Sequence, residues 1–216
     1  MIFVRAIIIL ALGLSLSACA SARKNSADAD AISQAANSDI VITNPDADLS
    51  ISNVTIRVPD ALVVSEENRY YPSGDIVWRE DPPGDRRAQV KAIFEDGIGR
   101  GVATLDGPST YDLDIEVLRF HALTQKARYS VGGVHSITFK VTLLDPQTGQ
   151  AVGEPRIVQA DLPGYGGDDA IAADAQGFTQ KFRITNHLAN VIVVELSVPG
   201  GYSNARLGVL QTINNT

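Results

Sequence analysis

The sequence predicts an α+β domain in which two amphipathic helices pack on one face of an antiparallel sheet, with the element order β-β-α-β-β-β-α. Apolar and polar residues alternate through 111–117 and 137–143, which is the period of a strand with one buried face. Apolar residues recur at helical spacing through 90–105 and 171–196. The chain of 216 residues has a single cysteine, so a packed core must stabilise the fold without an internal disulfide.

The first half of the domain is predicted to begin with two strands. Alternation over 49–58 indicates the first strand, and a slip in its phase at Asn53-Val54 indicates a bulge. A turn follows at Pro59-Asp60, and the apolar run 62–64 indicates a short second strand. A polar, aromatic loop then leads to the apolar stretch 76–78.

A helix is predicted after Asp85, because two prolines end the preceding stretch and the Asp85 side chain can cap the first turn. Gly97 and Gly101 lie inside its apolar stripe, where a glycine costs about 1 kcal/mol relative to alanine. We therefore expect this helix to lie close against the sheet at the glycines.

Three antiparallel strands are predicted next, over 111–122, 137–143 and 151–161, with a polar, basic loop over 125–133. A hairpin at 145–150 joins the second strand to the third. Pro155 lacks a backbone N–H, so the third strand is expected at an edge of the sheet.

Three carboxylates, of Asp112, Asp114 and Glu116, project from one face of the first of these strands. A cation site needs ligands that converge from several segments, whereas carboxylates along one strand usually form a solvated face. The sequence therefore predicts no metal site here.

The last helix is predicted over 171–196, although the run 191–194 taken alone would also suit a strand. Pro199-Gly200-Gly201 ends the helix, and residues 199–216 are interpreted as a polar C-terminal tail.

An export signal precedes the domain. Arg5 and an apolar run of about eleven residues fit a signal peptide, and this run is too short to span a bilayer. The sequence Leu16-Ser17-Ala18-Cys19 resembles a bacterial lipobox, which implies that residues 1–18 are removed and that Cys19 is acylated. Acylation would also explain an unpaired cysteine in an exported protein. The alternative is ordinary cleavage after Ala18, with Cys19 unmodified.

Residues 19–39 are predicted to be the acylated cysteine and a flexible linker to a single domain over 40–198. Small and polar residues fill 20–38, so this segment has little apolar surface to bury. As a coil it would reach about 25 Å on average, and a helix over 27–36 is an alternative. Ala20 and Ser21 follow the cysteine in place of an aspartate, which by resemblance to enteric lipoproteins favours the outer membrane over the inner membrane.

The net charge of −7 becomes −8 when Arg5 is removed with the signal. An acidic protein has no electrostatic attraction for nucleic acid or for phosphate-rich lipid surfaces. We therefore expect no nucleic-acid partner, and expect the acyl chains to hold the protein at the membrane.

Five segments resemble an uncharacterised family of Gram-negative lipoproteins known as a domain of unknown function. These segments are Asn68-Arg69-Tyr70-Tyr71-Pro72, Asp75-Ile76-Val77-Trp78-Arg79, Asp81-Pro82-Pro83-Gly84-Asp85-Arg86, Arg119-Phe120-His121-Ala122-Leu123-Thr124 and Val131-Gly132-Gly133-Val134-His135-Ser136-Ile137. The likeness covers residues 50–197 and implies no activity. More remotely, the order of the elements is similar to that of auxiliary lipoproteins of envelope lipid-transport systems.

Six residues form the candidate surface for a partner or ligand: Trp78, Arg79, Arg86, Phe120, His121 and His135. A tryptophan is more often a plug over the core than a stacking platform, and surface arginines usually pair with neighbouring acids. His121 and His135 fall on neighbouring predicted strands and are the best titratable pair in the chain. No nucleophile with a base beside it is evident, the histidines lack zinc spacing, and no cofactor is implied.

The sequence therefore predicts a periplasm-facing lipoprotein that binds an envelope protein within a transport or maintenance assembly and is not an enzyme. Two alternatives remain. The first is a lipid or small-molecule binder with a groove between sheet and helices, walled by Trp78 and Phe120. The second is a hydrolase that uses His121 or His135 beside an acid.

Overall fold

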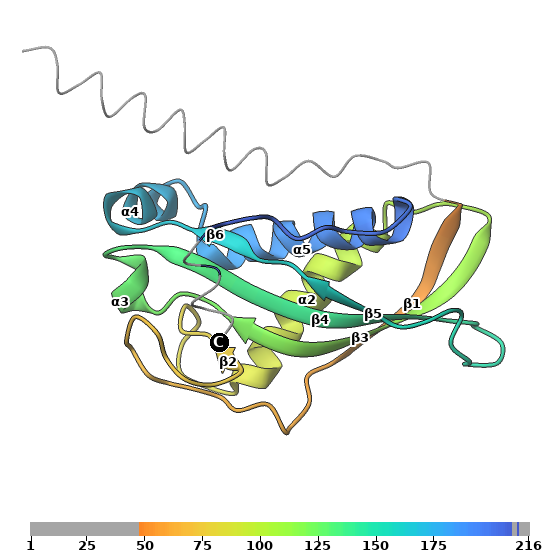
Figure 1. The fold of residues 1–216 in the computed structure, drawn as a ribbon, viewed down its shortest axis with the longest axis horizontal. Helices are drawn as coiled ribbons and strands as arrows, with labels where there is room; N and C mark the ends of the chain where they lie inside the picture. The colour runs from red at the N-terminus through yellow and green to blue at the C-terminus, as the bar shows by residue number, and fades with distance from the viewer. Residues whose placement is uncertain (1–47, 209–210, 212–216) are drawn as a thin grey trace, which may run out of the picture.

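The computed structural model describes residues 48–208 and 211, so the predicted signal peptide, Cys19, the linker and residues 40–47 lie outside the described residues. The described part is an α+β fold with a six-stranded sheet and four named helices (Figure 1). The elements are β1 (Leu49–Arg57), β2 (Ile76–Val77), α2 (Arg86–Val102), β3 (Ser109–His121), α3 (Gln125–Arg128), β4 (Gly133–Leu144), β5 (Arg156–Gln159), β6 (Leu162–Gly164), α4 (Gly167–Ala175) and α5 (Gln180–Ser197).

The sheet has the order β1-β3-β4-β5, with β2 also paired to β3 and β6 also paired to β4. The β3–β4 and β4–β5 pairs are antiparallel, as predicted. The strand β6, which the sequence did not predict, also pairs antiparallel with β4. The prediction of a wholly antiparallel sheet is wrong for β1 and β2, which both run parallel to β3. The reason lies in the connection: α2 intervenes between these strands and β3, and a helical crossover returns the chain in its original direction.

The first predicted strand is confirmed as β1. Its pairing with β3 shifts between Ile51 and Asn53, so the predicted irregularity lies at Ser52. The predicted strand at 62–64 is wrong, because only Val64 makes an isolated bridge, to Ile76. The Asp75 side chain accepts a hydrogen bond from the Val63 N–H at 2.8 Å, which holds this segment as a loop.

The predicted first helix is confirmed as α2, and the Asp85 side chain accepts from the Ala88 N–H at 3.1 Å as its cap. The expectation that its glycines face the sheet is wrong. A Cβ at Gly97 would lie 2.7 Å from the Thr185 carbonyl oxygen, and a Cβ at Gly101 would lie 2.5 Å from the Ala189 carbonyl oxygen. The two glycines therefore allow α2 to cross closely over α5.

The predicted last helix is two helices, α4 and α5. The break contains Gly177, whose φ of +84° is left-handed, and Thr179, whose hydroxyl caps α5 by accepting from the Phe182 N–H. The run 191–194 is helical within α5. Helix α3 forms within the segment that was predicted to be a loop, so the fold has four helices where two were predicted.

The predicted return strand is shorter than expected, because β5 covers only Arg156–Gln159. Gly153 has a φ of +80° and Pro155 cannot donate a hydrogen bond, so the preceding residues cannot continue the ladder. The edge position of β5 is confirmed.

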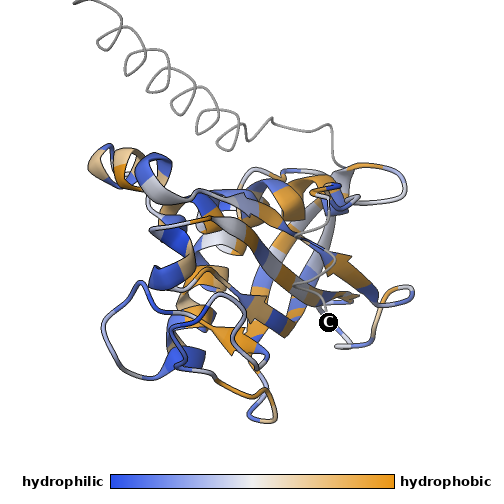
Figure 2. Cartoon of the chain, turned by 60° about the vertical axis from the view of Figure 1, so that its left-hand side comes forward, coloured by the Kyte–Doolittle hydropathy of each residue, from blue (hydrophilic) through white to orange (hydrophobic). Residues whose placement is uncertain are grey.

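The core lies between one face of the sheet and the helices α2 and α5, where hydrophobic segments of the ribbon face one another (Figure 2). The Phe94 and Phe139 rings pack edge to face, with centroids 5.5 Å apart. On the opposite face of the sheet, Arg57 pairs with Asp114 and Glu116. This face is the solvated side that the alternating carboxylates predicted.

Beyond α5, the described C-terminal residues contact the domain. Tyr202 packs against the core, and the Asn204 and Gln211 side chains both donate to the Asp161 carboxylate. Within the described residues, no helix has the length and apolar character needed to cross a membrane.

Candidate functional site

Trp78 and Phe120 lie in the core and present no surface to a ligand, since both side chains are 0% exposed. Their ring centroids are 5.7 Å apart, and the Trp78 indole N–H donates to the Asp81 carboxylate at 2.8 Å. Together with Phe94 and Phe139, they fill the space between sheet and helices. The sheet–helix groove that a lipid or small molecule was expected to use is therefore occupied by side chains.

Arg79 and Arg86 are bound within the chain by the same carboxylate, that of Glu66. The Arg86 Nε and Nη2 atoms donate to the two Glu66 oxygens at 2.6 and 3.1 Å, and Arg79 Nη1 donates to Glu66 as well. The hydrogen bond from Arg86 is the main cause that lowers the pKa of Glu66 below its ordinary value. These arginines brace the loop that precedes β2, and they are not an open anion site.

His121 is buried beneath the same loop. Its Nε2 atom lies 3.0 Å from the Pro72 carbonyl oxygen, which can only accept, so His121 donates to the loop backbone. His121 therefore holds Pro72 in place.

His135 is also fully buried, on the opposite face of the sheet from His121, because His121 pairs with Ser136 and successive strand residues alternate between faces. Its Nδ1 atom accepts from the Leu123 N–H at 3.3 Å. Burial, assisted by the charges of Arg183 and Arg128, lowers the pKa of His135 well below its ordinary value. The two histidines are therefore not brought together as a titratable pair.

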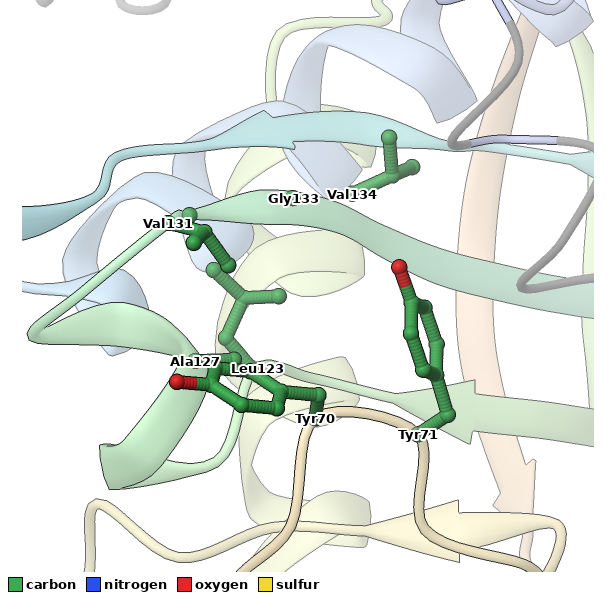
Figure 3. Close-up of a pocket in the computed structure, with 8 residues that line it drawn as sticks. Tyr70, Tyr71, Leu123, Ala127, Val131, Gly133 and Val134 are labelled. Atoms are coloured by element: carbon green, nitrogen blue, oxygen red, sulfur yellow. The ribbon is translucent and has the colours of Figure 1, made fainter.

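The structure places a different feature on the surface of this region, a hollow that we call the tyrosine hollow. Its lining residues are Tyr70, Tyr71, Leu123, Ala127, Val131, Gly132, Gly133 and Val134, and its volume is about 280 Å³. Tyr70 and Tyr71 come from the loop before β2 (Figure 3). The other residues come from the segment that follows β3, from α3, from the turn after α3 and from the start of β4. The hollow is lined mainly by apolar atoms and contains no acidic residue.

Large apolar and aromatic side chains at the hollow are exposed to solvent. Val131 is 72% exposed, Tyr71 54% and Tyr70 43%. Figure 3 shows the Tyr71 ring rising toward Val134, while Tyr70 lies beside Ala127 and Leu123. Exposed groups of this kind gathered around a concave site mark a surface suited to binding.

Three hydrogen bonds fix the loop that carries the tyrosines. The Lys126 N–H donates to the Asn68 side chain at 2.9 Å, and the Thr124 hydroxyl donates to the Arg69 carbonyl at 2.8 Å. The third is the bond from His121 to Pro72 at 3.0 Å. The loop is therefore held at both sides of Tyr70 and Tyr71, so the hollow is formed before any partner arrives.

The sequence did not single out Tyr70 and Tyr71 as a site, although both lie in a segment that resembled the lipoprotein family. The available signal was a pair of tyrosines in a polar loop, which has no reason to be buried there. Within the part of the chain that the structure describes, no group of three or more histidine, cysteine or acidic side chains could hold a metal ion.

Comparison with known families places the fold in context. A model described as a family of unknown function, DUF6778, matches residues 49–212. This match agrees with the resemblance to a domain of unknown function seen in the sequence, and it extends that resemblance at the C-terminal side. No curated protein is matched by the sequence.

Two solved structures are similar to parts of the chain. A Xanthomonas campestris protein of the DUF330 family is 14% identical, with a TM-score of 0.41, over 69% of this chain and 84% of that chain. A Caulobacter crescentus CB15 protein, whose description proposes a lipoprotein, is 18% identical, with a TM-score of 0.29, over 54% of this chain and 83% of that chain.

Proposed function

The chain belongs to the DUF6778 family, and we propose that it is a lipoprotein, anchored through Cys19, whose domain binds a protein partner and catalyses no reaction. In this proposal the acyl chains hold the domain at the periplasmic side of the envelope, with the outer membrane favoured over the inner one. The partner belongs to an envelope or transport assembly, such as those served by auxiliary lipoproteins of lipid transport.

The observation that carries the proposal is the tyrosine hollow. Its rim exposes Tyr70 and Tyr71, on a loop that is fixed by hydrogen bonds, and Val131, which lies between α3 and β4. Aromatic side chains bury much area on binding at a small cost in conformational entropy, and they are enriched at the centres of protein interfaces. The lipobox ending in Cys19 supports the anchor.

The same geometry gives little support to catalysis by the residues singled out in the sequence. Arg79 and Arg86 are paired with Glu66, His121 is bonded to Pro72, and His135 lies buried on the other face of the sheet. A general base must be able to reach a substrate within hydrogen-bond distance. None of these side chains offers such a group to a bound molecule.

Metabolic labelling tests the anchor. A labelled fatty acid should enter the protein in cells and should fail to enter a Cys19→Ser variant. Absence of the label from the wild-type protein would refute acylation at Cys19.

A photoreactive amino acid placed at Val131 tests the docking surface in the native envelope. The matched control is the same probe at Ile157, which is similarly exposed at 67% but lies on β5, in a different part of the sheet. We expect a discrete protein adduct from position 131 and not from position 157. An acylated, folded protein that gives no adduct at 131 would contradict partner binding at the tyrosine hollow.

A further inference from the structure

The tyrosine hollow has a size and a charge that restrict what can occupy it. We propose that its occupant is a segment of the partner protein that presents one bulky apolar side chain with a carboxylate beside it. This inference rests on the proposed partner-binding function and specifies the chemistry of the partner.

The size of the hollow suits a single large side chain. Its volume of about 280 Å³ lies at the lower limit of the range of about 300 to 1,000 Å³ that small-molecule pockets usually show. A leucine, phenylalanine or tryptophan side chain fits within such a hollow. The apolar lining supplied by Leu123, Ala127 and Val134 matches this kind of group.

Charge identifies the second part of the partner motif. Lys126 is exposed on α3 next to Ala127, and its Nζ atom lies 4.8 Å from the centroid of the Tyr70 ring. No ion pair joins this ammonium group to a residue of the described chain. Since the lining contains no acidic residue, Lys126 gives the rim a positive charge on an otherwise acidic protein.

A carboxylate of the partner would therefore meet Lys126 while the neighbouring apolar side chain enters the hollow. Complementary charge at an interface fixes orientation and selects among partners more than it adds affinity. The apolar group provides most of the binding, and Lys126 decides which flanking residue is accepted.

Selection of random heptapeptides displayed on phage, against the acylated full-length protein in detergent micelles, tests this proposal. We expect enriched peptides to carry leucine, isoleucine, phenylalanine or tryptophan beside aspartate or glutamate. Lys126→Glu should weaken these acidic peptides about two- to five-fold, the range for one exposed ion pair, and should shift the selection toward basic peptides. Lys91→Glu, on the exposed side of α2, should leave the selection unchanged.

Several outcomes would overturn the inference. One is that the enriched peptides lack an apolar residue. A second is that Lys126→Glu leaves their charge preference unaltered. A third is that the hollow binds a fluorescent fatty acid and no peptides. A photoreactive residue at Val131 that reacts only with residues 212–216 of the same chain would also overturn it. If the probe at 131 captures an envelope protein and Lys126→Glu has no effect, the proposed function stands and only this inference fails.

Discussion

The crossing of α2 over α5 should depend on Gly101 having no side chain. In a Gly101→Ala variant, the added Cβ would lie 2.5 Å from both the Ala189 carbonyl oxygen and the Ile192 Cγ2 atom. Real Cβ atoms do not come this close to backbone atoms, so the two helices must separate or tilt. Over-packing of a buried contact usually costs about 1 to 3 kcal/mol, and contact with backbone places this case at the upper end.

A compensating gain comes from helix propensity. Alanine is favoured over glycine within a helix by up to about 1 kcal/mol, so the expected net loss for Gly101→Ala is about 2 kcal/mol. For a domain of this size, such a loss lowers the Tm by about 4 to 8 °C. Thermal and urea unfolding followed by circular dichroism would measure both quantities, in a Cys19→Ser background that keeps the protein free of acyl chains.

Gly99 provides the matched control, because it lies in the same helix and a Cβ there would meet nothing within 4 Å. Gly99→Ala should therefore keep the propensity gain alone and raise stability by up to about 1 kcal/mol. The two substitutions should have opposite signs. Equal stabilisation by both would show that α2 and α5 do not cross at Gly101 as described.

Three further predictions concern pH, the arginine brace and the tyrosine loop. Burial lowers the pKa of His187 from 6.5 to about 4, so between these pH values the unfolded chain binds a proton that the folded chain does not. The free energy of unfolding should therefore fall by up to roughly 3 kcal/mol as pH falls across this range, and urea unfolding should show a weaker dependence on pH for His187→Gln. Glu66→Gln should lower the free energy of unfolding by about 1 kcal/mol, because it removes the ion pair of the buried Arg86. Glu95→Gln, at an exposed pair with Lys91, should lower it by about 0.5 kcal/mol or less, and urea unfolding measures both. His121→Phe should speed hydrogen exchange in peptides covering 68–73, because the bond to Pro72 is lost; unchanged exchange there would count against the fixed loop.

Local signals in the sequence were sufficient for several elements. The alternation over 111–117 gave β3, and Asp85 marked the start of α2 because its side chain can serve one backbone N–H in the first turn. The break between α4 and α5 also had a local signal, a glycine followed two residues later by the capping residue Thr179. The apolar spacing over 171–196 predicted one helix through this break, and that prediction is wrong.

Other features were not readable locally, because tertiary contacts decide them. Alternation indicates which face of a strand is buried but not the direction of its neighbour, so the parallel pairing of β1 with β3 was missed. Gly97 and Gly101 indicated a close approach, but the partner surface could be a sheet or a helix. Trp78 and His121 were conspicuous by residue type, but the burial of Trp78 follows from core packing against Phe120, and that of His121 from the loop that folds over it.

The residues chosen from the sequence and the hollow found in the structure are physically connected. Glu66 is tied to Arg86 and His121 holds Pro72, so both contacts limit where the loop that carries Tyr70 and Tyr71 can lie, whereas Trp78 and Phe120 lie in the core. A loop that is fixed in advance loses less conformational entropy on binding, and more of its contact energy then appears as affinity. Loosening this support should therefore weaken partner binding even where no contacting side chain has changed, because the fraction of molecules that present a formed hollow falls.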